Sequence, residues 1–209
     1  MRTGFVPFIV AILVLGAPRF AHAAPADQIV IDTSLGEITV ALDRAHAPAT
    51  VDNFLRYANE GHFDGTLVYR VVPGFVIQAG SYDSATNQRP VHDPIPLEAN
   101  NGLSNVRGTI AMAREDTPNT ATAEFFINLA DNLRLDHHVD DAGNATGYTV
   151  FGRVVSGMDV VDKIASVQLG DGGPMPGAWP LQPVTIRKVR LLTTPAAIPS
   201  PAAAPAPSP

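Results

Sequence analysis

The stretch Tyr69-Arg-Val-Val-Pro-Gly-Phe-Val-Ile-Gln-Ala-Gly80 decides the fold of this chain, because it holds two β-like runs joined by a turn at Pro73-Gly74. One cation, Arg70, and one amide, Gln78, alternate with large apolar residues on either side of that turn. Successive strand residues point to opposite faces, so each polar side chain shares a face with the apolar residue two positions away. The stretch therefore predicts a hairpin that presents a fixed cation beside an apolar pocket.

Similar β-rich runs continue on both sides of this hairpin. Together with its own two strands they give eight expected strands: 28–33, 37–42, 66–72, 75–79, 109–113, 124–128, 148–154 and 184–191. Apolar residues at helical spacing predict two helices, at 48–60 and 157–165. Eight strands can close into a barrel whose interior is filled by side chains. The pattern therefore favours a closed barrel with a helix at each end and with its binding groove on the outer surface.

Composition places one domain at residues 27–193 and excludes several functions. The chain has 209 residues, of which 45% are hydrophobic and 16% charged, enough for one sizeable core. Its net charge of −6, without a basic stripe, argues against nucleic acid as a partner. It contains no cysteine, which excludes disulfides, thiol catalysis and cysteine metal sites.

The N-terminal pattern at residues 1–23 predicts a signal peptide. Met1-Arg2 provides a positive start, Phe5–Leu15 is almost wholly apolar, and Ala21-His22-Ala23 is a small-x-small cleavage pattern. The apolar run is shorter than the roughly 20 residues that a membrane-spanning helix needs. We therefore expect export without stable membrane insertion after cleavage; the alternative is a short membrane anchor.

Residues 194–209 are rich in proline and alanine. Such a segment buries little apolar area and disfavours a helix, which predicts a disordered, polyproline-like tail. A spacer is the simplest interpretation. A docking site for a proline-binding module and a poor substrate for the chain's own active site are the alternatives.

Four motifs appear in order: the opening stretch, Arg107-Gly-Thr-Ile-Ala-Met-Ala-Arg114, Ala121-Thr-Ala-Glu-Phe-Phe-Ile-Asn128 and Gly147-Tyr-Thr-Val-Phe-Gly-Arg153. Together they resemble the motifs of the cyclophilins, and the bacterial periplasmic type most of all. This resemblance implies a mainly β fold, a closed eight-stranded antiparallel β-barrel capped by two α-helices. It also implies a peptidyl-prolyl cis-trans isomerase that needs no cofactor or metal. Nothing in the sequence suggests an obligate dimer, so we expect a monomer. Its partners would be unfolded or partly folded proline-containing polypeptides, in the periplasm or elsewhere in the cell envelope or outside a bacterium.

The reaction of that family suits the residues of the opening stretch. Rotation about a peptide bond meets a barrier of about 18–20 kcal/mol because amide resonance is lost. No covalent bond breaks, so a pocket for the proline ring and a donor such as Arg70 to the prolyl nitrogen are sufficient. The resemblance implies three catalytic residues, Arg70, Gln78 and Phe75. It implies eight substrate-binding residues: Val76, Ala113, Arg114, Glu124, Phe126, Arg134, Leu135 and Tyr148.

Within that set, the resemblance gives different roles to different positions. The proline pocket falls on Phe75, Val76, Phe126 and Leu135. Gln78 is expected to orient Arg70 and to bond the substrate. Ala113 and Arg114 lie where the family binds the residues before proline, mainly through backbone groups.

Several positions depart from the family pattern. Glu124 stands where glutamine is usual, which opens the possibility of an ion pair with Arg70 or Arg134. Arg134 stands where an aromatic residue is usual, so we expect weak inhibition by cyclosporin. Tyr69 and Val76 replace a common histidine and a common methionine. Both of the latter changes should be tolerated. Glu124 and Arg134 leave open a binding module or holdase with weak catalysis, and the tail leaves open a structural protein displayed on it.

The segment Asp136-His-His-Val-Asp-Asp141 offers an alternative chemistry, because histidine and carboxylate side chains suit Zn²⁺. It runs into Gly143-Asn144, which is typical of a solvated loop. We favour the loop.

Overall fold

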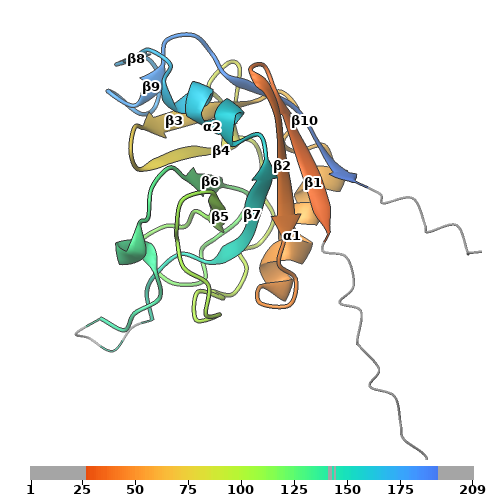
Figure 1. Ribbon diagram of the computed structural model, residues 1–209, viewed down its shortest axis with the longest axis vertical. Helices are drawn as coiled ribbons and strands as arrows, with labels where there is room; N and C mark the ends of the chain where they lie inside the picture. The colour runs from red at the N-terminus through yellow and green to blue at the C-terminus, as the bar shows by residue number, and fades with distance from the viewer. Residues whose placement is uncertain (1–26, 141–142, 144, 193–209) are drawn as a thin grey trace, which may run out of the picture.

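Eight antiparallel strands close into a barrel in the computed structural model, which describes residues 27–140, 143 and 145–192 (Figure 1). The order around the barrel is β1 (Gln28–Thr33), β10 (Thr185–Leu192), β3 (Thr66–Val72), β4 (Val76–Asp83), β6 (Phe125–Asn128), β5 (Thr109–Met112), β7 (Val150–Ser156) and β2 (Gly36–Leu42). Every neighbouring pair is antiparallel. The predicted barrel is confirmed. The predicted signal peptide at 1–23 and tail at 194–209 lie outside the described residues.

The two predicted helices, α1 (Pro48–Asn59) and α2 (Met158–Ala165), lie towards opposite ends of the barrel (Figure 1). Proline occupies the first turn of α1, where its missing N–H is not needed. Both helices bury apolar side chains in the barrel interior, such as Phe54 from α1 and Ile164 from α2. Within the described residues, neither these helices nor any other is long and apolar enough to cross a bilayer.

Three short elements were not predicted. β8 (Leu169–Gly170) pairs with β9 (Trp179–Pro180), and a 3-10 helix, η1, spans Leu133–Leu135. Elements of two or three residues are too short to show a period of 2 or 3.6 in the sequence.

The barrel wall has apolar side chains on both of its faces. On β6, Phe125 and Ile127 belong to the interior core, whereas Phe126 points outwards. β5 repeats the alternation, with Ile110 inside and Ala111 outside. We call the outward-facing group the outer cluster. Its buried members are Val76, Ala111, Ala113, Phe126 and Val150, and Phe75, Leu103, Leu135 and Tyr148 pack against them.

A β-bulge in β3 interrupts the alternation beside this cluster. Val68 pairs with Ala79 and Arg70 pairs with Gln78, so two steps along β3 match one step along β4. Tyr69 is the extra residue. Tyr69 is buried but belongs to neither apolar cluster. Its hydroxyl accepts a hydrogen bond from Gln78 Nε2 on the outer side of the wall. The bulge therefore supplies two consecutive polar side chains, Tyr69 and Arg70, to one face.

Candidate active site

The outer cluster unites six of the residues that the sequence predicted for substrate contact: Phe75, Val76, Ala113, Phe126, Leu135 and Tyr148. They come from β4, β6, η1 and three separate loops. The structure adds Leu103, Ala111 and Val150, which sequence reasoning missed. Ala111 and Val150 lie in strands, where small and aliphatic residues give no sign of which face is functional, and Leu103 lies in a loop without a periodic pattern.

A single row of paired residues crosses the wall at the level of Arg70. Arg70 pairs with Gln78, Gln78 with Phe126, and Phe126 with Ala111. Because neighbouring strands lie about 4.8 Å apart, the backbone of Arg70 is about 10 Å from that of Phe126. A guanidinium on its long side chain can therefore reach over an apolar floor made by Phe126 and its neighbours.

Gln78 holds Arg70 at the edge of this floor. The Arg70 Nη1 donates to Gln78 Oε1 at 3.1 Å, and the Arg70 Cζ lies 5.8 Å from the centroid of the Phe75 ring. A guanidinium has five N–H donors. The others make no hydrogen bond to the described residues, so they are available to a substrate.

Glu124 forms neither of the ion pairs that the sequence left open. Its Oε2 accepts hydrogen bonds from the Tyr69 hydroxyl at 2.5 Å and from Gln78 Nε2 at 2.9 Å. Among the described residues, no arginine lies within ion-pair distance of it. Burial, and then the charge of Glu124, raise the pKa of Tyr69, so the phenol stays protonated and donates. Tyr69 and Gln78 thus bind the Glu124 carboxylate, for which the sequence left open an ion pair with Arg70 or Arg134.

Two arginines stack on aromatic rings of the outer cluster. The Arg134 Cζ lies 4.6 Å from the Phe75 centroid, and the Arg114 Cζ lies 4.9 Å from the centroid of Tyr148. Tyr148 in turn meets Phe126 edge to face, with centroids 5.5 Å apart. Stacking of this kind keeps a cation in place without neutralising it.

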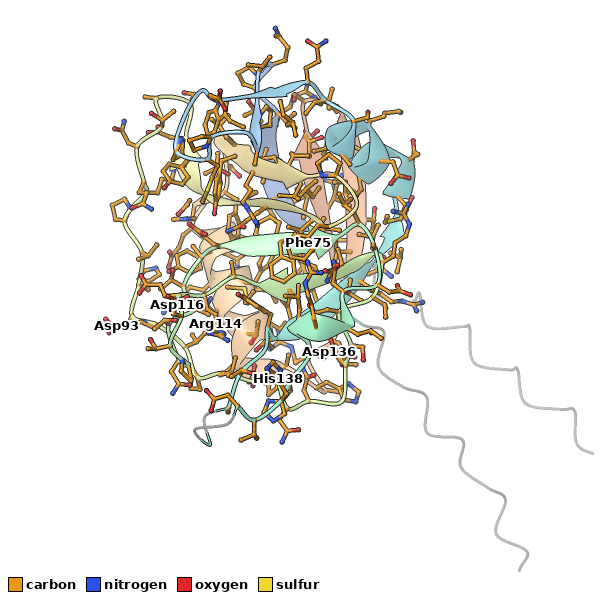
Figure 2. The ribbon with its side chains drawn as sticks, turned by 90° about the vertical axis from the view of Figure 1, so that its left-hand side faces the viewer. Phe75, Asp93, Arg114, Asp116, Asp136 and His138 are labelled. Carbon is orange, nitrogen blue, oxygen red and sulfur yellow. The ribbon has the colours of Figure 1, made fainter. Side chains whose placement is uncertain are left out.

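The side chain of Arg114 is committed to the protein itself. Its Nε donates to the Gly147 carbonyl at 2.8 Å, and its Nη1 donates to the Glu115 carbonyl at 2.7 Å. These bonds hold the Arg114 side chain against its own loop and against Gly147. Figure 2 shows Arg114 and Phe75 apart from each other on the same face of the molecule.

A buried network of three asparagines, which the sequence analysis missed, ties the loops of the site together: Asn105, Asn128 and Asn132. Asn132 Nδ2 donates to the Phe75 carbonyl at 2.9 Å, and Asn105 Nδ2 donates to the Leu135 carbonyl at 3.1 Å. The one available signal was Asn128, a polar residue directly after the apolar run of β6.

Two hollows adjoin the outer cluster. One, of about 340 Å³, is lined by Ala113, Arg114 and Glu124. It continues the strip of the outer cluster that runs from Val76 past Phe126 to Ala113, and we call this strip the groove. The larger, of about 920 Å³, touches the cluster only at Leu103 and Val150 and otherwise extends over β2 and β7. Because the larger hollow holds none of Arg70, Gln78 or Phe126, we place the candidate site over the outer cluster despite the difference in size.

No group of three or more metal-ligating side chains occurs within the described ranges. In the segment that offered a zinc site, Asp136 Oδ1 accepts the backbone N–H of Asn105 at 2.6 Å. His138 Nδ1 lies 3.1 Å from the backbone carbonyl of Asp136. Asp141 of that segment lies outside the part of the chain that the structure describes.

Comparison with known proteins agrees with this arrangement. The family model described as cyclophilin type peptidyl-prolyl cis-trans isomerase/CLD matches residues 28–191. Peptidyl-prolyl cis-trans isomerase A of Dickeya dadantii is 44% identical over 186 residues, which cover 88% of this chain and 95% of that protein. Peptidyl-prolyl cis-trans isomerase B of Escherichia coli is 45% identical over 146 residues, covering 70% and 88% of the two chains. The chain belongs to the cyclophilin-type peptidyl-prolyl cis-trans isomerases and is an enzyme of that class.

A solved structure supports the fold. The crystal structure of a cyclophilin-type peptidyl-prolyl cis-trans isomerase of Cryptosporidium parvum matches with a TM-score of 0.67 at 21% identity. The match covers 81% of this chain and 99% of that one. The two proteins therefore share the barrel fold although only 21% of their residues are identical.

Proposed function

We propose that this isomerase acts on X-Pro bonds of exported polypeptides during their folding, with the proline ring on the outer cluster and Arg70 as the donor. The row that joins Arg70, Gln78 and Phe126 across three strands is the observation that carries the proposal. It sets a fixed cation beside an apolar floor on which a proline ring can lie.

Arg70 favours the twisted amide over the planar one. As resonance is lost, the lone pair of the prolyl nitrogen becomes available, and a guanidinium N–H can donate to it. Gln78 occupies one N–H of Arg70 and so fixes the direction of the others. The guanidinium remains protonated throughout, so the step needs no proton transfer.

The remaining predicted residues divide between the ring pocket and the peptide backbone. Phe75, Val76, Phe126 and Leu135 surround the proline ring, and Tyr148 closes the pocket beside Phe126. The backbone at Ala113 and Arg114 binds the residues before proline, next to the hollow that Glu124 lines. Arg134 lies at the Phe75 end of the groove.

Export is the second part of the proposal. It is supported by the signal-peptide pattern at residues 1–23 and by the likeness to bacterial enzymes. We propose that the mature chain works as a monomer in the periplasm, free of the membrane, and meets unfolded clients there. Fractionation of cells that produce the full chain tests this, since an uncleaved chain in the cytoplasm would contradict it.

The alternative is a proline-segment binding module or holdase. One observation supports this alternative. Glu124 accepts a hydrogen bond from Gln78, and Gln78 is the residue that positions Arg70. A rate measurement separates binding from catalysis.

Exchange NMR on an Ala-Pro peptide tests the catalytic proposal. We expect residues 24–209 to accelerate cis-trans exchange, and Arg70→Ala to lower kcat/KM by about 100-fold or more, the usual loss for one preorganised donor. Arg190→Ala is the matched control, because Arg190 pairs with Glu37 across β10 and β2, far around the barrel. Binding of the peptide without faster exchange would favour the holdase.

A further inference from the structure

The groove runs along β6 and has two distinguishable ends. Val76 pairs with Asn128, and the N–H of Ala113 bonds to the Glu124 carbonyl. Four residue steps separate these two positions, about 13 Å at the usual rise of a strand. Phe126 lies midway, so a peptide with its proline on Phe126 extends one or two residues towards each end.

The end beyond Asn128 carries positive charge. Arg134 stacks on one ring there, Phe75, and Arg70 lies over the same ring at a longer distance. Arg134 is exposed, and among the described residues it makes no ion pair and no side-chain hydrogen bond.

The acids next to Arg134 in the chain are already engaged. Asp131 Oδ1 accepts the backbone N–H of Arg107 at 2.9 Å. Asp136 Oδ1 accepts both the backbone and the side-chain N–H groups of Asn105, at 2.6 and 3.0 Å. The charge of Arg134 is therefore held at a fixed place by Phe75, with its N–H groups directed to solvent or to a ligand.

The opposite end carries negative charge. Glu115 and Glu124 line the hollow beside Ala113, and Asp116 follows directly. Figure 2 shows Asp93 and Asp116 on the same side of the view as Arg114, away from Phe75. Arg114 and Arg89 also line this end, but their guanidinium groups are bonded to backbone carbonyls. The two ends therefore differ in the groups that they offer to a peptide: the unbonded N–H groups of Arg134 at one end, and the carboxylates of Glu115 and Asp116 at the other.

We propose that Arg134 makes this isomerase selective for segments with an acidic residue one or two positions after the proline. The proposal rests on the proposed function, because it takes the direction of the peptide from the assignment of the preceding residues to the Ala113 end. A carboxylate one or two residues after the proline can accept a bidentate pair of hydrogen bonds from the Arg134 guanidinium. Arginine forms such a pair better than lysine does.

Five peptides test the selectivity: Ala-Ala-Pro-Xaa-Xaa with Xaa as Glu, Gln or Lys, and the reversed Glu-Glu-Ala-Pro-Ala and Lys-Lys-Ala-Pro-Ala. We expect kcat/KM from exchange NMR to be about threefold or more higher for Glu than for Lys after proline, the range of exposed ion pairs. The ratio should shrink at high salt, because the charges are exposed.

Variants assign the effect to one side chain. Arg134→Gln should bring the Glu-to-Lys ratio close to one, and Arg134→Glu should invert it. Arg190→Gln, which changes the net charge equally on the far side of the barrel, should leave the ratio unchanged. A wild-type ratio near one, a ratio that survives Arg134→Gln, or a preference for acid before rather than after proline would overturn the proposal.

The affinities of the same peptides, from chemical-shift titration, keep the two proposals apart. Binding that follows the predicted order without acceleration of exchange contradicts the proposed catalysis and supports the selectivity. Acceleration of all peptides alike, with equal affinities, supports the catalysis and contradicts the selectivity.

Discussion

Tyr69 determines where the negative charge of Glu124 lies. Its hydroxyl donates to Glu124 and accepts from Gln78 Nε2, so the carboxylate stays within a closed set of hydrogen bonds. Without the hydroxyl, Glu124 loses its shortest bond and becomes free to approach the guanidinium of Arg70. An ion pair there would weaken Arg70 as a donor to the prolyl nitrogen.

We therefore predict that Tyr69→Phe lowers kcat/KM about three- to tenfold, equivalent to about 0.7–1.4 kcal/mol in the barrier. Adding Glu124→Gln should restore most of the loss, because a neutral amide does not pair with Arg70. Exchange NMR on the two single variants and the double variant gives the coupling energy. Additive losses would show that the two residues act separately.

At the same scale, the sequence identified the residues but not all of their contacts. Arg70, Gln78 and Phe126 were predicted together because their motifs resemble one family, and strand pairing places them in one row. The bond from Tyr69 to Glu124 was not predicted. It joins residues 55 positions apart and depends on a bulge that no local pattern reveals.

The elements around the groove depend on the buried asparagine network. Asn128 is fully buried; its Nδ2 donates to Asn105 and Thr109, and its Oδ1 accepts from Asn132. Removing that amide leaves several buried groups without partners. The loops that hold Phe75 and Leu135 are joined through the same network.

Asn128→Ala is thus expected to lower the free energy of unfolding by about 2–3 kcal/mol, the penalty for unsatisfied buried groups. It should also raise KM for an Ala-Pro peptide, because the ring pocket loosens. Urea unfolding and exchange NMR measure the two effects. The control is Asn59→Ala at the exposed end of α1, which should change stability by no more than about 0.5 kcal/mol.

Among the elements, those with strong periodicity were predicted and those set by tertiary contacts were not. The strands at 28–33 and 66–72 and the helix at 157–165 match within one residue. β4 continues to Asp83 rather than ending at 79, because its irregular pairing with β3 extends to Thr66. The pair β8–β9 forms where Leu169 meets Pro180, a contact between segments with no periodic signal of their own.

The stability of the whole barrel should depend on pH through His62. This histidine follows α1, and its Nε2 lies 2.9 Å from the Gly80 carbonyl in β4. Burial is the main cause that lowers its pKa below the ordinary value of 6.5, and Arg89 adds to the shift. The neutral ring is therefore favoured in the folded state.

Between the ordinary pKa and the lowered one, the unfolded chain binds more protons than the folded chain, so stability rises with pH. We predict that the free energy of unfolding falls as pH drops below 6.5, and that His62→Gln makes this fall shallower. Glutamine can still donate to Gly80 but does not titrate. Urea unfolding at pH 7.5 and 5.5 measures the difference. An equal slope in the wild type and in His62→Gln would contradict the prediction.

The alternation of side chains through the barrel wall has a consequence for directed evolution of this enzyme. One layer of sheet supports the core with Phe125 and Ile127 and the groove with Phe126 and Ala111. A library restricted to outward positions, such as Ala111 and Val150, leaves every interior side chain as it is. Selection at those two positions can therefore reshape the outer cluster without a change to the interior core.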